Sequence, residues 1–283
     1  MKLKNLCLTI GIAVLSVPAL ASTNWSDGTF NATLDIGGTI TPSDYTQNWR
    51  WKTGDALTGL NKNILEMTDN SRKLTVTFSK KTAILLGETV EGIKSYAGLS
   101  GMTPQISFSD ISGNEVVLQQ DTSNAVSKGH LTLDVRNKDD QKIGSLKLNV
   151  TSAGMAVTPK SREWESFGLQ ARQPGEVFYG GLFPRSAEKG HSQVSGMISP
   201  LGVKTSTQLR SMLTGHPEFV RPSTTDWLAQ YTSSVKLGQV TGLYAFAYGM
   251  YIDNGQELEA TFDNPVSSTT NWKSKLNVSI TYL

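Results

Sequence analysis

Thr29-Phe30-Asn31-Ala32-Thr33-Leu34-Asp35-Ile36-Gly37-Gly38-Thr39-Ile40 is the stretch from which the fold of this chain can be argued. Its apolar residues alternate with polar ones, so an extended backbone places four of them on one face: Phe30, Ala32, Leu34 and Ile36. The same alternation returns near the end of the chain, in Leu276, Val278, Ile280 and Tyr282. Chain ends usually fray unless they are tied down. We therefore expect these two strands to pair either within the domain or with another chain.

The first 21 residues have the features of a secretory signal peptide. Lys2 and Lys4 precede an apolar run from Leu6 to Val17, and Ala19-Leu20-Ala21 is a cleavage site of the small-x-small type. We predict cleavage after Ala21, which makes residues 1–21 the signal peptide. No later segment is long and apolar enough to predict a membrane helix.

Composition limits the chemistry that is open to the mature chain. The single cysteine, Cys7, lies in the leader, so we expect no disulfide, no thiol nucleophile and no cysteine-ligated metal. Lys2 and Lys4 also leave with the leader, and 24 basic residues then balance 24 acidic ones. A net charge of zero gives no indication of nucleic acid or of an anionic membrane as a partner.

Between the terminal strands, short alternating segments separated by turn residues predict an antiparallel β-sandwich. One hairpin is expected over residues 105–118, around Asp110–Gly113, and a second over residues 130–150, through Asn137–Asp140. Other strands are predicted at residues 49–52, 74–78, 83–87, 241–252 and 257–262.

The pattern changes over residues 155–235, which we interpret as a mixed insertion. Short helices are expected after Ser161, Thr207 and Thr225, and a strand is expected over residues 177–181. Aromatic residues concentrate in the insertion, among them Trp164, Phe167, Tyr179, Trp227 and Tyr231. They could form its small core or stack on the apolar face of a sugar, and the sequence leaves both interpretations open.

The chain contains no complete catalytic motif, because its two SxxK matches, Ser186/Lys189 and Ser233/Lys236, are followed by neither of the companion motifs SDN and KTG. The three histidines are isolated, and neither a nucleophile elbow nor a nucleotide-binding glycine loop is present. Glu257 and Glu259 could mimic an acid–base pair, but they alternate with Leu258 and Ala260, which favours a solvated strand face. We therefore expect no enzyme activity, no catalytic residue, no metal and no cofactor.

Short motifs run in order along the mature chain, among them Asp35-Ile36-Gly37-Gly38, Trp49-x-Trp51-Lys52, Phe178-Tyr179-Gly180-Gly181-Leu182 and Leu276-Asn277-Val278-x-Ile280-Thr281-Tyr282. Together they resemble the FaeG-type fimbrial subunits, the large pilins and lactose-binding adhesins that enteric bacteria assemble by the chaperone/usher route. The resemblance implies a fold that is all-β: an incomplete immunoglobulin-like sandwich, formed by residues 41–154 and 236–283, that lacks its last strand. Residues 155–235 would be an inserted subdomain.

The resemblance also implies a mechanism of assembly and a set of partners. A periplasmic chaperone would first fill the gap in the sandwich, and an outer-membrane usher would then direct its replacement by the N-terminal extension of a neighbouring fimbrial subunit. This donor-strand complementation would use residues 22–40, with Phe30, Ala32, Leu34 and Ile36 as the donor side chains. The acceptor groove, and the strand that the chaperone pairs with, would be bordered by Leu276, Val278, Ile280 and Tyr282.

The predicted function is thus a structural subunit of a surface fimbria, exported through the periplasm to the cell surface and also mediating adhesion to host glycans. The family's adhesive member binds galactose-containing glycans through its insertion. No sugar-contacting residue is carried over from that member, so the candidates for ligand binding come from the aromatic residues alone: Trp164 and then Trp227. The alternative is a monomeric secreted lectin-like β-sandwich, which would keep its N-terminal strand in its own sheet.

Overall fold

The computed structural model describes residues 45–121, 127–185, 190–227 and 231–283, which all belong to the compact unit Ser43–Leu283. The signal peptide and the proposed donor extension, residues 1–40, lie outside the described residues. Two short α-helices occur in the described part, α1 (Gly190–Ile198) and α2 (Ser206–Thr214), together with the 3-10 turns η1 (Tyr45–Asn48), η2 (Ile64–Glu66) and η3 (Ser199–Leu201). Neither helix is long or apolar enough to cross a membrane.

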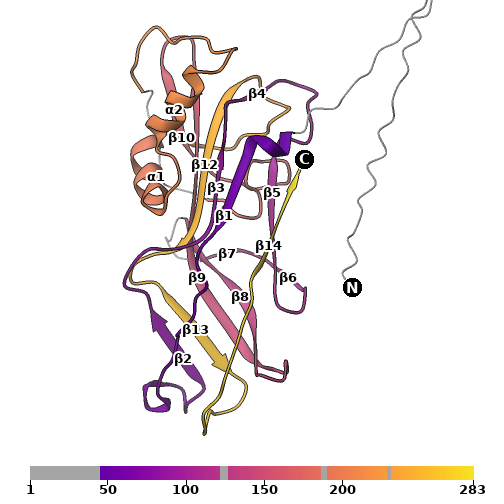
Figure 1. The fold of residues 1–283 in the computed structure, drawn as a ribbon, viewed down its shortest axis with the longest axis vertical. Coiled ribbons are helices and arrows are strands. Elements are labelled where there is room, and N and C mark those ends of the chain that lie inside the picture. Colours follow the sequence, from indigo (N-terminus) through magenta and orange to yellow (C-terminus); the bar gives the residue numbers. More distant parts are fainter. Residues whose placement is uncertain (1–44, 122–126, 186–189, 228–230) are drawn as a thin grey trace, which may run out of the picture. The chain divides into compact units, whose positions relative to one another are not determined.

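Strands make up most of this unit (Figure 1). Among the described residues, eleven strands form the larger sheet: β1 (Trp49–Thr53), β2 (Lys73–Thr77), β3 (Thr82–Thr89), β4 (Ile93–Ser95), β7 (Gln119–Gln120), β8 (Lys128–Arg136), β9 (Lys142–Pro159), β10 (Trp164–Leu169), β11 (Thr232–Ser233), β12 (Gly242–Ile252) and β13 (Glu257–Phe262). Its main path runs β1-β3-β12-β9-β10-β11. The smaller sheet has the order β14-β5-β6 and consists of β5 (Pro104–Ser109), β6 (Glu115–Val116) and β14 (Asn277–Tyr282).

The predicted all-β antiparallel architecture is confirmed. Both expected hairpins form, because β5 pairs with β6 through Phe108 and Val116, and β8 pairs with β9 through Leu131 and Leu148. The apolar side chains of β5 share one buried cluster with those of β8 and β9. The small sheet therefore packs on the larger one as the second layer of a sandwich.

The middle of the large sheet is buried on both faces. Along β12, Phe246 and Tyr248 join the cluster shared with the small sheet, whereas Ala245 and Ala247 join a second cluster under the helices. The second cluster also contains Leu209 and other apolar residues of α1 and α2. Successive side chains of a strand point to opposite faces, so a strand covered on both sides becomes a continuous apolar run. The sequence of β12, GLYAFAYGMYI, has this character.

Several details of the insertion differ from the sequence-based expectation. The helix expected after Ser161 is wrong, because residues 164–169 form β10, which pairs with the far end of β9. Trp164 and Phe167 share a face in a helix, but in the strand they face different clusters. The strand expected at residues 177–181 is a turn. Described residues 225–227 are not helical, and residues 228–230 lie outside the described part.

The helix expected near Thr207 exists as α2, but it begins earlier. Thr205 is its N-cap: the Thr205 hydroxyl accepts from the Gln208 backbone N–H, and the Gln208 side chain accepts from the Thr205 N–H. This reciprocal capping box satisfies two of the free donors at the helix start. Helix α1 was not predicted from the sequence. The large sheet continues into residues 155–235 through β9 and β10, so the subdomain boundaries stay an interpretation.

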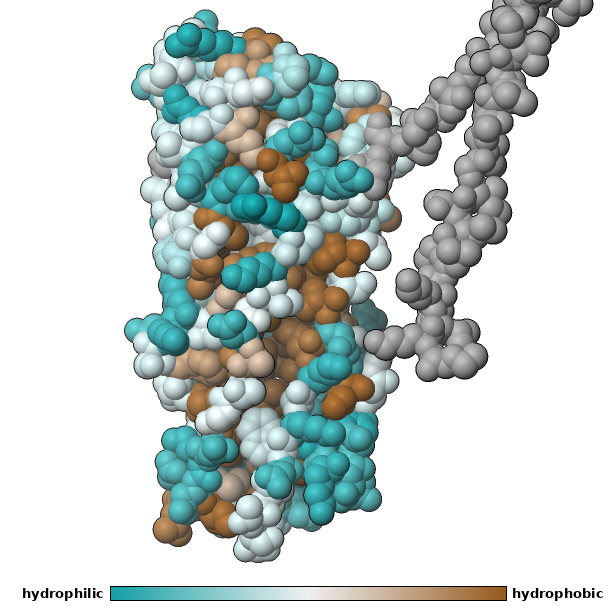
Figure 2. All heavy atoms as spheres, viewed as in Figure 1, coloured by the Kyte–Doolittle hydropathy of each residue, from teal (hydrophilic) through white to brown (hydrophobic). Residues whose placement is uncertain are grey.

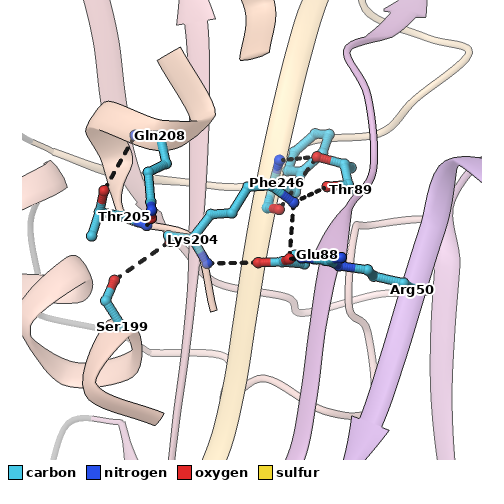
Figure 3. Close-up of polar contacts among 8 residues, drawn as sticks. All are labelled: Arg50, Glu88, Thr89, Ser199, Lys204, Thr205, Gln208 and Phe246. Atoms are coloured by element: carbon cyan, nitrogen blue, oxygen red, sulfur yellow. Dashed lines mark hydrogen bonds and ion pairs between the residues drawn. The ribbon is translucent and has the colours of Figure 1, made fainter. Parts of the chain in front are cut away.

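A buried carboxylate fixes the start of α2 to the large sheet (Figure 3). Glu88 of β3 accepts from the Lys204 backbone N–H at 2.6 Å, from Lys204 Nζ at 2.9 Å and from the Arg50 guanidinium. Lys204 Nζ also donates to the carbonyl of Thr89 at 3.1 Å. Burial by itself raises the pKa of Glu88, but the bonds from Lys204 and Arg50 outweigh it and hold the pKa below its ordinary value of 4.5.

Candidate functional site

A long apolar groove lies between the two sheets of the sandwich. Its volume is about 1040 Å³, and its floor consists of buried leucines and a phenylalanine from β2, β8, β9 and β13: Leu74, Leu133, Leu146, Leu148, Leu258 and Phe262. One wall is the segment from Thr53 to Met67, which follows β1. The other wall is the segment from Val266 to Leu276 together with Val278 of β14. Hydrophobic side chains gather along the course of β14 on the face shown in Figure 2.

The C-terminal strand has one free edge toward this groove. Within the described residues β14 pairs only with β5, in the register Val278 opposite Phe108 and Ile280 opposite Ile106. Directly opposed residues of antiparallel strands share a face. Val278 and Ile280 therefore point to the same side as the buried Phe108 and Ile106, yet they remain only partly buried. A strand whose inward face is incompletely covered and whose edge is unpaired is suited to accept a further strand.

Next to one end of the groove, aromatic side chains join β1 and β14, the strands that adjoin its two walls. Trp51 Nε1 of β1 donates to the Tyr282 hydroxyl of β14 at 3.0 Å. The neighbouring Trp49 donates from Nε1 to the carbonyl of Met102 at 3.1 Å, and the two indoles stack with centroids 6.3 Å apart. Trp49 and Trp51 thus share a face of β1, as the alternation predicts. The Trp51–Tyr282 bond ties the two edge strands together at this end.

The structure places the four predicted residues of the terminal strand along one line. Leu276 and Val278 line the groove, and Ile280 and Tyr282 continue the inward face of the strand toward Trp51. All four pack against the main apolar cluster. Their predicted partners, Phe30, Ala32, Leu34 and Ile36, lie outside the described residues, so the pairing of donor and groove stays a prediction.

Sequence reasoning missed the opposite wall of the groove. Residues 54–63 form neither helix nor strand and were given no role from the sequence, yet Leu57 and Leu60 pack against the main cluster and line the groove, as does Met67. The only sequence signal was a pair of leucines three residues apart in a glycine- and asparagine-rich segment. Lysines lie on the rim on both sides: Lys62 pairs with Glu66 at 3.0 Å, and Lys273 pairs with Asp140 at 2.6 Å.

The two tryptophans proposed as ligand-binding residues are brought together. Their ring centroids are 6.4 Å apart, and the backbones of Trp164 and Trp227 form an isolated parallel bridge. Trp164 is only 2% exposed and stacks on Phe219 at 5.6 Å, so its indole is part of the core beneath the helices. Trp164 therefore belongs to the core, one of the two roles that the sequence left open, and the part of both tryptophans in ligand binding stays a prediction. Trp227 is partly exposed.

The carboxylate pair considered for catalysis is engaged with the sheet. Glu259 forms an ion pair with Lys73 on the neighbouring strand β2, and Glu257 accepts a bond from the Thr77 hydroxyl at 3.2 Å. The hydrogen bond from Lys73 lowers the pKa of Glu259. In the described part of the chain no three His, Cys, Asp or Glu side chains gather as metal ligands would.

Comparison with known proteins gives one consistent result. The model of the family described as "Fimbrial, major and minor subunit" matches residues 3–283. K88 fimbrial proteins AC and AB of Escherichia coli are each 34% identical to this chain, and K88 fimbrial protein AD is 32% identical. Each match covers 99% of this chain and 100% of the relative.

Proposed function

We propose that the groove of this chain accepts the N-terminal strand of a neighbouring subunit. The chain belongs to the family of major and minor subunits of K88-type fimbriae, which supports this proposal. The chain is a structural subunit of a surface fimbria. Its mature form would polymerise by donor-strand complementation: residues 22–40 of one subunit would lie in the groove of the next and pair with the free edge of β14.

The observation that carries this proposal is the groove beside an edge strand. Its floor is apolar throughout, and the partly buried Val278 and Ile280 leave room for side chains from another strand. A donor strand with alternating apolar residues would present Phe30, Leu34 and Ile36 to this floor. Burying each of these large side chains is worth on the order of 1.5–3 kcal/mol. Backbone hydrogen bonds to β14 would fix the register and the orientation of the donor strand in the groove.

An open apolar groove requires protection before assembly. We propose that a periplasmic chaperone covers it by pairing with β14, and that an outer-membrane usher then exchanges the chaperone for the next subunit. This route would carry the protein through the periplasm to the cell surface. The proposed role is structural rather than catalytic, in agreement with the family.

Adhesion is the second part of the proposal. Residues 155–235 carry the helices and the Trp164–Trp227 pair on the side of the large sheet opposite the small sheet. We propose that any binding of host glycans, including galactose-containing ones, resides there. The alternative of a monomeric lectin needs the N-terminal strand to pair within its own subunit, so a subunit that stays monomeric with residues 22–40 intact would favour it.

The donor role of residues 22–40 can be tested with a pair of matched variants. Leu34→Asp places a charge on the apolar face of the donor strand, where a buried unpaired charge is strongly unfavourable. Thr33→Asp adds the same charge one residue away, on the opposite face. We expect the first variant to lose surface fimbriae, measured by electron microscopy and by heat-released fibre protein, and the second to keep them.

Equal fibre yield from both variants would contradict the donor assignment. Loss of fibres in both variants would show that the strand tolerates charge on neither face, which would contradict a single apolar face inserted in the groove. Periplasmic subunit levels measured in parallel keep an effect on assembly separate from an effect on export.

A further inference from the structure

We infer that the helical side of the subunit carries a binding site for an acidic sugar, in a small pocket between α2, the start of β10 and residues 219–225. This inference rests on the adhesive part of the proposed function and names its ligand class. The pocket has a volume of about 250 Å³, below the range of about 300–1,000 Å³ that drug-sized ligands occupy. It therefore suits one terminal monosaccharide rather than a peptide strand.

Two arginines line this pocket from different elements. Arg210 comes from α2, and Arg221 comes from the exposed segment after Phe219. Within the described residues neither guanidinium forms an ion pair with a carboxylate, whereas Arg50 pairs with Glu88 and Arg136 pairs with Asp134. Two cations without an acidic partner, facing one hollow, favour an anionic ligand.

The geometry of Arg210 is fixed before any ligand arrives. Its Cζ lies 4.9 Å from the ring centroid of Trp164 and 5.4 Å from that of Trp227, and Nη1 donates to the carbonyl of Thr225 at 2.8 Å. A guanidinium stacked on indoles keeps the N–H groups at its edge available. Such a preorganised fork matches the two oxygens of a carboxylate or a sulfate, and little side-chain entropy is lost on binding.

The other lining residues suit the rest of a sugar ring. Phe219, stacked on the buried Trp164, forms an aromatic wall, and Thr214 and Thr224 contribute hydroxyl groups that can bond to sugar hydroxyls. Sites for small polar ligands usually combine an apolar wall with a few directed polar groups. Paired arginines add a requirement for negative charge, so the inferred ligand is a monosaccharide that carries a carboxylate or a sulfate group. The Trp164–Trp227 pair thus contributes mainly by holding Arg210.

The test uses purified fimbriae and matched sugars. Glucuronic acid and glucose differ only in a carboxylate in place of a hydroxymethyl group, and galactose 6-sulfate and galactose differ only in the sulfate. Arrays of glycans that end in each of these sugars should show at least tenfold stronger binding to the acidic member of one or both pairs. The two pairs tell carboxylate recognition from sulfate recognition.

Two substitutions test whether the acidic sugar binds in this pocket. Arg221→Gln removes an exposed charge in the pocket, and we expect it to lower the preference for the acidic sugar at least fivefold. Arg72→Gln removes an exposed charge near β2, remote from the pocket in the sequence and in the fold, and should leave the preference unchanged. Where the preference is for the carboxylate, free glucuronate, but not its methyl ester, should compete with the bound glycans.

Equal binding of acidic and neutral sugars by wild-type fimbriae would overturn the inference, even if both variants failed to assemble. A preference that survives Arg221→Gln unchanged would also overturn it. Binding to neutral galactose glycans alone would agree with the proposed adhesive function but contradict the inferred site for an acidic sugar. Failure of assembly through residues 22–40 would be seen in the fibre yield and not in the sugar preference.

Discussion

The carboxylate of Glu88 is predicted to hold the helical layer onto the sheet, and Glu88→Gln tests this prediction. The substitution keeps the side-chain volume but replaces an oxygen by an amide NH₂ where donors from Lys204 and Arg50 converge. The Glu88 side chain is 5% exposed, so the loss is not compensated by water. Removing one partner of a fully buried ion pair costs about 3–5 kcal/mol. The side chain of Arg50 is 61% exposed, which reduces this figure, and we expect about 2–3 kcal/mol.

The assay is urea unfolding of the subunit complemented with a donor strand, followed by circular dichroism. We expect a lower midpoint at unchanged slope, and a melting temperature lowered by roughly 5–10 °C. The matched control is Glu218→Gln, because Glu218 pairs with Lys94 at 2.9 Å on the exposed surface, and it should leave the midpoint unchanged. Equal midpoints for wild type and Glu88→Gln would refute the assigned role.

The pH dependence of the difference in unfolding free energy between wild type and Glu88→Gln gives an independent check. Because the pKa of Glu88 is lowered in the folded state, its contribution is complete above the ordinary value of 4.5. The contribution is lost as the pH falls through the lower folded pKa. The gap in unfolding free energy between wild type and Glu88→Gln should therefore be constant from pH 7 to pH 5 and shrink below pH 4.5. A gap that grows on acidification would contradict the account.

Two further predictions concern the end of the groove and the helical layer. Tyr282→Phe removes the acceptor of the Trp51 Nε1–H hydrogen bond and should lower the unfolding free energy by about 1 kcal/mol. The control is Tyr96→Phe at an exposed site, which should leave the unfolding free energy unchanged. Equal effects of the two substitutions would argue against the Trp51–Tyr282 bond. Trp164→Ala removes an indole that is 2% exposed, and a denaturant titration should show the unfolding free energy lowered by about 3–5 kcal/mol. A decrease below about 1 kcal/mol would show that the indole is not part of the core.

The sandwich could be predicted from the sequence because most of its strands are covered on one face. Alternation along β14 and the turn residues between β8 and β9 identify these strands without knowledge of their partners. The same reasoning failed at β10, where both faces are buried and the spacing of Trp164 and Phe167 imitates a helix. Periodicity disappears where a strand is covered on both sides.

The candidate sites could be predicted only in part, because they depend on contacts between distant residues. The wall of the groove that contains the terminal strand could be predicted from the alternation of that strand. The wall formed by residues 54–67 could not, because it depends on contacts that form only when the chain folds. The bond between Glu88 and Lys204 joins residues 116 positions apart. The pocket around Arg210 likewise needs α2 and the segment after Phe219 to be placed against β10.

The central claim, that the groove accepts the N-terminal strand of a neighbour, is tested most directly by peptide complementation. A subunit lacking residues 22–40 is released from its chaperone in the presence of a synthetic peptide of residues 29–40 or of the same peptide carrying Leu34→Asp. Hydrogen exchange is then measured on residues 276–283. We predict a one-to-one complex with slowed exchange along β14 for the native peptide and none for the variant. Equal exchange rates with the native peptide, the variant peptide and no peptide would contradict the account.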